Sequence, residues 1–341
     1  MLLALPQIEA PTRSTRTHCP FCAFQCGTVL TSDNTLSLHI EGDADFPVNA
    51  GRLCVKGWTA AELLGHQDRL LTPLVRGTFG ELLPASWPAA LDRIAEAFQR
   101  IQAEHGLDAV GVFGSGALTN EKAYLLGKFA RVALRTPHID YNGRYCMASA
   151  AGAGNKAFGI DRGLPFPVSD IALSQTLFVV GSNPFDTLPP IAQWFEKQRA
   201  NGGKLIVADP RRTPTARSAD LHLQLTPGSD LALANGLLFI AIEEKLLDVG
   251  FIQKRTNGFD TVRRTVLQYH PGRVEQLTGV PESAMRQAVR WLAKSGPSMI
   301  LTGRGPEQQS KGVDGVLGFI NLVLALGQIG TPGAGYGTLT G

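Results

Sequence analysis

The 341-residue chain lacks both a strong charge bias and a hydrophobic run long enough to cross a membrane. Its 32 Lys and Arg nearly balance its 29 Asp and Glu, and no basic block suits a nucleic-acid backbone or an anionic bilayer. The longest apolar stretch, residues 316–329, contains Asn321 and Gln328 and falls short of the roughly 20 residues of a membrane span. We therefore expect no nucleic-acid or membrane partner and a buried helix at 316–329.

The amino-terminal residues also lack the pattern of an export signal. Pro6 and Glu9 interrupt the few apolar residues, and Arg13 and Arg16 are not adjacent as a twin-arginine signal requires. The expected location is the cytoplasm, where thiols stay reduced. A hydrophobic content of 44% excludes an intrinsically disordered chain.

Cysteine is scarce, with five residues, but four of them are grouped as C-x2-C-x3-C-x27-C at Cys19, Cys22, Cys26 and Cys54. An odd total in a reducing compartment argues against a disulfide framework. A compact triplet closed by one distant cysteine is typical of a [4Fe–4S] cluster. The alternative is a four-cysteine zinc site, although zinc ribbons use two separated C-x2-C pairs.

From residue 86 onward, the pattern alternates between helices and short buried strands. Strands are predicted at 109–113, 176–180, 204–208, 221–225 and 298–301, with helices at 86–106, 119–134, 188–201, 229–247 and 282–294. This alternation predicts doubly wound α/β domains with mainly parallel sheets, whose ligands bind beyond the carboxyl ends of the strands.

Residues suited to a bound nucleotide follow three of these strands. Small residues and side-chain donors precede a helix start whose free amides suit phosphate, arginines can hold a pyrophosphate, and a carboxylate can pair with a guanine edge. The turn at 114–116 has only two glycines of a nicotinamide fingerprint, and an ordinary tight turn explains it as well. The candidate cofactor contacts are Gly181, Ser182, Asn183, Asp209, Pro210, Arg211, Arg212, Thr213, Gly228 and Asp230.

The fifth cysteine, Cys146, has two interpretations. A lone cysteine is commonly a small buried hydrophobe. Alternatively it is a thiolate metal ligand, because Arg144 and a helix beginning near Ala148 both favour the thiolate.

Together these features resemble the molybdopterin oxidoreductases that carry molybdenum on two guanine dinucleotides. The resemblance runs from Cys19 to about Tyr336 and depends on the cysteine quartet, Cys54-x-Lys56-Gly57, Arg144-x-Cys146-Met147, and the Gly-Ser-Asn and Asp-Pro-Arg-Arg-Thr loops. It implies a [4Fe–4S] cluster on the quartet, Lys56 between cluster and pterin, and Cys146 as the molybdenum ligand. Further pterin contacts are assigned to Asn142, Gly303, Arg304 and Gln308. Arg144 is expected either to help hold the substrate anion or to form an internal salt bridge.

Within this family, a cysteine followed by methionine is similar to the nitrate reductases, and the cytoplasmic assimilatory kind fits best. The resemblance therefore implies a molybdenum-dependent reduction of nitrate to nitrite by oxygen-atom transfer at a Mo-bis(MGD) centre. Electrons would come through the cluster from ferredoxin, flavodoxin or a reductase subunit. The alternatives are a formate dehydrogenase with the same cofactors and a non-catalytic iron–sulfur electron carrier.

The expected organisation is a small iron–sulfur domain at 1–72 followed by two α/β domains. The first is discontinuous, at 73–142 plus 304–341, and the second is inserted at 143–303 and binds one molybdopterin guanine dinucleotide. Because the family is about twice this length, the C-terminal family domain is expected to be absent, and the chain is expected to be a fragment or a truncated product.

Overall fold

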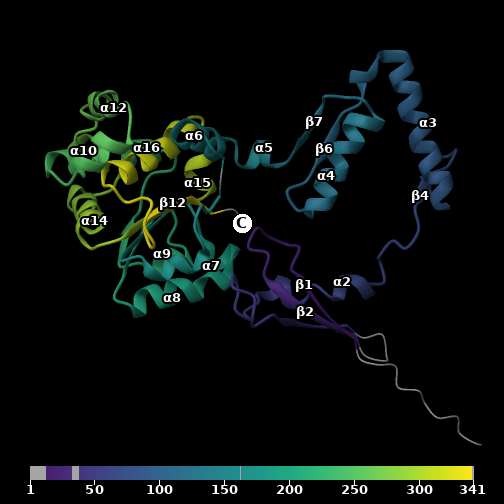
Figure 1. The fold of residues 1–341 in the computed structure, drawn as a ribbon, viewed down its shortest axis with the longest axis horizontal. Helices are drawn as coiled ribbons and strands as arrows, with labels where there is room; N and C mark the ends of the chain where they lie inside the picture. Colours follow the sequence, from purple (N-terminus) through teal and green to yellow (C-terminus); the bar gives the residue numbers. More distant parts are fainter. Residues whose placement is uncertain (1–12, 33–37, 162, 340–341) are drawn as a thin grey trace, which may run out of the picture. The chain divides into compact units, whose positions relative to one another are not determined.

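The computed structural model describes residues 13–32, 38–161 and 163–339, which form two compact units (Figure 1). The first unit holds residues 58–145 with 13–15, 30–32 and 38–40, and the second holds 16–29, 41–57 and 146–339. The start of the chain that was compared with an export signal, residues 1–12, lies outside the described residues.

A five-stranded, entirely parallel sheet forms the centre of the second unit. Its order is β10-β9-β8-β11-β12, so successive strands run outward in opposite directions from β8 and β11. This reversal lies between the two central strands, and ligands of such sheets bind beyond the carboxyl ends of the strands at this point. The strands are β8 (Thr176–Val180), β9 (Lys204–Ala208), β10 (Leu221–Leu223), β11 (Ser298–Thr302) and β12 (Gly335–Thr338).

The two faces of this sheet bury separate cores, because neighbouring side chains of a strand point in opposite directions. Leu177 and Val179 pack in one core with residues of α8 (Ala192–Ala200). Phe178 and Val180 pack in the other with α10 (Asp230–Glu243) and α16 (Gly312–Ala325). Figure 1 shows α8 on one side of the sheet, with α10 and α16 on the other. The doubly wound α/β arrangement is thereby confirmed.

The two helices of the second core meet closely because their contact residues are small. A Cβ atom on Gly318 of α16 would lie 2.8 Å from the Cβ of Ala234 of α10. Both helices are apolar nearly all round, which is typical of helices buried inside a protein. The buried helix predicted at 316–329 is correct for residues 316–325, and the helix ends before Gly327, which has φ of +67°.

Shorter elements complete the second unit. These elements are α1 (Val55–Trp58), α5 (Gly143–Cys146, which starts in the first unit), α6 (Ala148–Phe158), η3 (Val168–Leu173), α7 (Pro184–Thr187), η4 (Pro189–Ile191), α9 (Pro214–Arg217), α11 (Val249–Arg255), α12 (Phe259–Val266), α13 (Pro271–Thr278), α14 (Glu282–Lys294) and α15 (Arg304–Glu307). The predicted helices 229–247 and 282–294 correspond to α10 and α14, whereas α11, α12 and α13 were not predicted.

The first unit carries a long helix, a π-helical segment and two small sheets. Ser86 caps the long helix as predicted, accepting a hydrogen bond from the amide of Ala89 at 3.3 Å. The strand predicted at 109–113 is shorter, because residues 107–109 form a 3-10 turn. The elements are α2 (Glu62–Gly65), β4 (Leu74–Arg76), β5 (Leu82–Pro84), α3 (Trp87–His105), η1 (Leu107–Ala109), β6 (Val112–Gly114), α4 (Asn120–Lys128), η2 (Phe129–Ala133) and β7 (Ile139–Tyr141).

Large apolar side chains of the first unit are exposed in the described chain. Phe79 is 96% exposed and Trp87 is 65% exposed, and α3 has no buried residue. Contiguous exposed apolar surface is typical of a face that contacts another polypeptide segment.

A three-stranded sheet, in the order β1-β2-β3, links the amino-terminal segments. Its strands are β1 (Arg13–His18), β2 (Gly27–Ser32) and β3 (Leu38–Gly42). Across the described residues, no helix is both long and apolar enough to span a bilayer.

The last strand departs from the predicted domain organisation. Residues 304–341 were expected to join 73–142, but β12 pairs with β11 along its whole length, and 304–339 lie in the same compact unit as 146–303. The physical reason is the close parallel register, in which Ile300 faces Tyr336 in the middle of the sheet.

Candidate metal and cofactor centre

The four amino-terminal cysteines converge in the second unit. The amide of Cys19 donates to the carbonyl of Cys26 at 2.8 Å, and the amide of Gln25 donates to that of Cys22 at 3.1 Å, which closes the triplet into a tight loop. Burial and, to a smaller extent, the neighbouring thiols of Cys22, Cys19 and Cys54 together raise the pKa of the Cys26 thiol to about 12. Four thiols near one another form the donor set that an iron–sulfur cluster requires.

Asn49 explains how the distant fourth cysteine reaches the triplet. Its fully buried amide accepts from the amide of Gly27 at 2.8 Å and donates to the carbonyls of Gly27 and Arg52, at 3.1 and 2.9 Å. These bonds tie the residue after Cys26 to the segment before Cys54. Sequence analysis missed Asn49, because a lone asparagine in a loop carries no spacing pattern.

The cysteine segment is anchored on α8. The side chain of Gln193 donates to the carbonyl of Asn49 at 3.0 Å, and the indole of Trp194 donates to the carbonyl of Val48 at 3.1 Å. Cys19 and Cys26 are buried in the same core as the sheet residues that face α8. The candidate cluster site is therefore built into the large unit.

Lys56 lies between the cysteines and the end of the loop after β8. Its ammonium group donates to the carbonyl of Thr187, in α7, at 3.4 Å. Its charge also lowers the pKa of the Cys19 thiol, opposing the larger effect of burial. Lys56 thus lies close to both Cys19 and the carbonyl of Thr187, and its place between a cluster and a pterin stays a prediction.

The loops that follow β8 and β11 contact each other directly beyond the ends of these strands. The amide of Gly303 donates to the carbonyl of Val180 at 2.8 Å, and that of Gly305 donates to the carbonyl of Gly181 at 2.9 Å. A Cβ atom on Gly303 would lie 2.5 Å from the Cβ of Ser182. Small residues are therefore required here, because the two backbones leave no room for side chains.

Several predicted cofactor residues hold their own loops in place. Asn183 accepts a hydrogen bond from the hydroxyl of Thr215 at 2.8 Å, and Asp209 accepts from the amide of Arg211 at 2.7 Å. Thr213 caps α9 by accepting from the amide of Ala216 at 3.1 Å. The carbonyl of Pro210 accepts from Gln224 at 3.0 Å, and the side chains of Arg211 and Arg212 are exposed.

A cavity of about 360 Å³ adjoins the amino-terminal end of α10. The predicted residues Gly228 and Asp230 line it, together with the cationic side chains of Arg273 and Lys311. Burial raises the pKa of Asp230, and the charge of Asp209 raises it further, so these two loops lie near each other. Gln309 lines this cavity, whereas the predicted Gln308 does not and is exposed.

Arg304 is the cationic partner of Cys146. Its Nη1 atom donates to the carbonyl of Cys146 at 3.0 Å and approaches the sulfur at 3.7 Å. Its Nε atom is buried and has no hydrogen-bond partner among the described residues. Arg304 was predicted as a pterin contact, and the structure places its guanidinium at the candidate metal ligand.

Arg144 and Asn142 have other partners. Arg144 forms an exposed ion pair with Asp140, with Nε and Oδ2 2.7 Å apart, and this hydrogen bond lowers the pKa of the Asp140 carboxyl. The side chain of Asn142 accepts from the amide of Gly116 at 2.7 Å and so closes the turn after β6. The internal salt bridge that the sequence offered for Arg144 is therefore present, and its contact with a substrate anion stays a prediction.

A buried polar group lies behind Arg304. The carboxylate of Glu307 is 2.7 Å from Nη2 of Arg304 and accepts from the hydroxyl of Thr338 at 2.5 Å. Burial raises its pKa, while Thr338 and Arg304 oppose that effect. Sequence analysis did not identify Glu307, because its partners come from β11, β12 and α15.

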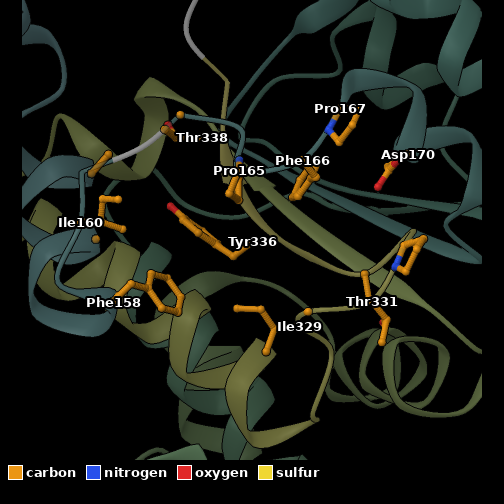
Figure 2. Close-up of a pocket in the computed structure, with 16 residues that line it drawn as sticks. Phe158, Ile160, Pro165, Phe166, Pro167, Asp170, Ile329, Thr331, Tyr336 and Thr338 are labelled. Atoms are coloured by element: carbon orange, nitrogen blue, oxygen red, sulfur yellow. The ribbon is translucent and has the colours of Figure 1, made fainter.

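A second cavity, of about 440 Å³, opens at the edge of the sheet beside β12. Figure 2 shows Phe158, Phe166 and Ile329 around the ring of Tyr336. The phenol lies 2.7 Å from the hydroxyl of Thr302, which connects the apolar cavity to the polar group around Glu307.

The donors described here fit the two groups that the sequence implied. Four converging thiols suit a cluster, while the cysteine beside an arginine with an unpartnered buried nitrogen suits a metal with an anionic ligand. Among the described residues, no three His, Cys, Asp or Glu side chains are close enough to hold a single metal ion.

Comparison with known proteins establishes the class. The chain belongs to the molybdopterin oxidoreductases: the family profile matches residues 69–340, and the profile of the family's Fe4S4 domain matches residues 12–66. The cofactors of the family are accordingly a molybdenum pterin and a [4Fe–4S] cluster. A [4Fe–4S] cluster in the segment 12–66 is thereby favoured over a zinc site, and its ligation by the four cysteines stays a prediction.

Particular relatives include two enzymes of different activity. The chain is 45% identical over 327 residues to the assimilatory nitrate reductase catalytic subunit of Bacillus subtilis, covering 95% of this chain and 46% of that protein. It is 36% identical over 331 residues to formate dehydrogenase H of Escherichia coli, with 95% and 46% covered.

The structure is similar to that of acetylene hydratase from Pelobacter acetylenicus, with a TM-score of 0.81 and 26% identity over 94% of this chain and 44% of that one. The chain therefore spans slightly less than half the length of each of these proteins.

Proposed function

We propose that the protein carrying this chain is a molybdenum-dependent nitrate reductase of the assimilatory type. The observation that carries the proposal is the 45% identity to a nitrate reductase, together with Met147 directly after Cys146. Met147 was the residue that favoured nitrate reductase over formate dehydrogenase in the sequence. A formate dehydrogenase remains the second candidate, since one such enzyme is 36% identical.

In this proposal, Cys19, Cys22, Cys26 and Cys54 ligate the [4Fe–4S] cluster and Cys146 ligates molybdenum on two guanine dinucleotides. Lys56 then lies between the two centres and stabilises negative charge as electrons pass. One dinucleotide would be held at the carboxyl ends of the sheet strands. Two observations support this place: the close approach of Gly303 to Ser182, and the cavity at Gly228 and Asp230 with its cationic side chains.

The metal centre supplies oxygen-atom transfer, in which nitrate, two electrons and two protons give nitrite and water. The chain contributes the surroundings of the reacting anion. Arg304 presents a guanidinium beside Cys146, which favours an anionic substrate at that place. The polar face of Arg304 thus takes the role that the sequence assigned to Arg144.

The electron donor and the location belong to the same proposal. Ferredoxin, flavodoxin or a separate reductase subunit delivers electrons through the cluster. The cytoplasm is proposed because it fits an enzyme of the assimilatory type, to which the chain is 45% identical.

Replacing Cys146 by serine tests the proposal in the full-length protein. We expect nitrate reduction with a viologen dye to be lost, while the EPR signal of the iron–sulfur cluster remains, because Cys146 is not one of the four grouped cysteines. Cys54→Ser is the matched control and is expected to remove the cluster signal. Unchanged nitrate turnover in Cys146→Ser would contradict the assignment, and formate oxidation by the unaltered protein would favour the second candidate.

A further inference from the structure

Glu307 occupies an unusual position for a charged residue. Its side chain is completely buried at the end of α15, three residues after Arg304, whose side chain is only 20% exposed. Oε2 of Glu307 lies 2.7 Å from Nη2 of Arg304 as an ion pair, and it accepts no hydrogen bond among the described residues. Burying a carboxylate is costly unless it is paired and hydrogen-bonded, so its partners indicate its role.

Two strand ends hold this carboxylate. Oε1 accepts from the hydroxyl of Thr338, in β12, at 2.5 Å and from that of Thr302, in β11, at 3.4 Å. Tyr336 supports Thr302 through its phenol, 2.7 Å away. The carboxylate is therefore held by groups on two neighbouring strands of the sheet.

Arg304 is held on both sides of its guanidinium. Nη2 faces Glu307 and donates to the hydroxyl of Thr338 at 2.7 Å, while Nη1 faces the carbonyl and sulfur of Cys146. An arginine has many rotamers, and a fixed carboxylate selects the one in which the other nitrogen points at the cysteine.

We propose that Glu307 is a positioning residue that fixes the guanidinium of Arg304 beside Cys146. Glu307 contacts neither the sulfur nor the substrate and acts through Arg304. This inference rests on one part of the proposed function, namely that Cys146 is the metal ligand. It holds whether the substrate is nitrate or another anion.

Chemical modification of arginine by phenylglyoxal reports directly on whether Arg304 is held. In the full-length protein, the rate at Arg304 is followed by mass spectrometry in the unaltered form and in Glu307→Gln, which keeps the shape and removes the charge. We expect Arg304 to react at least about threefold faster in the variant, because a charge-assisted contact is lost.

Glu244→Gln is the matched control, since Glu244 pairs with Arg290 through Oε2 at 2.8 Å. This variant is expected to speed the reaction of Arg290 and leave Arg304 unchanged. An unchanged rate at Arg304 in Glu307→Gln would overturn the proposal. If Glu307→Gln raises the modification rate of all the arginines alike, the same rates are measured in Thr338→Val. A faster reaction of Arg304 alone in that variant supports the proposal, and any other result overturns it.

A double-mutant cycle provides the second readout. In the full-length enzyme, Glu307→Gln is expected to lower kcat/KM for nitrate by roughly tenfold, and by much less when Arg304→Lys is already present. Equal effects in both backgrounds would mean that Glu307 acts independently of Arg304, contrary to the proposal. If nitrate is not the substrate, the arginine-modification result still stands, so failure of the proposed function is distinguishable.

Discussion

Arg304 and Arg144 were both expected at the cofactor, and their side chains have different partners. Arg144 is close to Cys146 in sequence, yet its guanidinium pairs with Asp140 and is 68% exposed. Arg304 is 158 residues from Cys146 and contacts its sulfur and carbonyl. Proximity in sequence is thus a poor guide to which cation lies beside the sulfur of Cys146, because contacts between distant parts of the chain decide it.

Matched lysine substitutions separate the two arginines. Arg304→Lys is expected to lower kcat/KM for nitrate by about tenfold or more, because lysine cannot contact Cys146 and Thr338 with one planar group. Arg144→Lys is expected to change it by less than about twofold, since an exposed ion pair contributes little. Steady-state kinetics of the two full-length variants provides the measurement, and a larger loss in Arg144→Lys would reverse our assignment.

At the scale of elements, the site depends on how closely α15 approaches the loop after β8. A Cβ atom on Gly305 would lie 2.6 Å from the Cα of Gly181, which is backbone and cannot move aside as a flexible side chain can. The start of α15, and with it Arg304, is therefore placed by the absence of a side chain at Gly305.

Gly305→Ala is accordingly expected to destabilise the protein by about 1–3 kcal/mol through overpacking. Gly272→Ala, in α13, is the control: its new methyl group would have no neighbour within 4 Å, and alanine favours a helix by up to about 1 kcal/mol. Urea unfolding of both variants gives the comparison. Equal stability of the two variants would show that α15 can shift without cost.

A cluster of ion pairs joins α14 to the end of α10. Arg286 contacts Glu243, Glu244 and Glu282, and Arg290 contacts Glu244. The hydrogen bond from Arg290, followed by the one from Arg286, lowers the pKa of the Glu244 carboxyl below its usual range.

This shift predicts a pH dependence of stability. Because the folded-state pKa of Glu244 is depressed, its contribution is present above the unfolded-state value and is lost as the pH falls through the folded-state value. Glu244→Gln should therefore cost about 0.5–1 kcal/mol at pH 7 and less than that at pH 3. Urea unfolding at both pH values tests this, and a deficit that persists undiminished in acid would exclude the ion pairs as its cause.

At the scale of the molecule, the chain spans slightly less than half the length of its relatives and exposes apolar side chains on its first unit. The second unit nevertheless contains all five cysteines, the five-stranded sheet and the two cavities of about 360 and 440 Å³. The candidate ligands of the cluster and of the metal therefore belong to one compact unit.

Metal analysis tests the whole-molecule proposal. The full-length protein, matured in cells that make the cofactor, is expected to contain about four irons and one molybdenum. The same iron content without molybdenum would identify an electron carrier in place of an enzyme. Cys146→Ser should keep the iron and lose most of the molybdenum, which distinguishes a missing ligand from failed maturation.

The local sequence determined the elements and the ligand types. Strands 176–180 and 204–208 are correctly predicted because a short β-branched, apolar run between turns has one stable arrangement in a sheet core. The cysteine quartet was likewise legible, since a cluster needs its ligands at characteristic spacing. The helices between 249 and 278 were missed because each has only seven or eight residues, which is shorter than the window over which a helical period can be recognised.

Only the tertiary structure decided which distant groups meet. Three features join distant residues: the pairing of β12 with β11, the contact of Arg304 with Cys146, and the hydrogen bond from Thr338 to Glu307. The residues that they join are 31 to 158 positions apart in the chain. Such contacts follow from the strand order of the sheet, in which each crossover carries a loop to the same edge. Local propensities report on neighbours along the chain and contain no information about that edge.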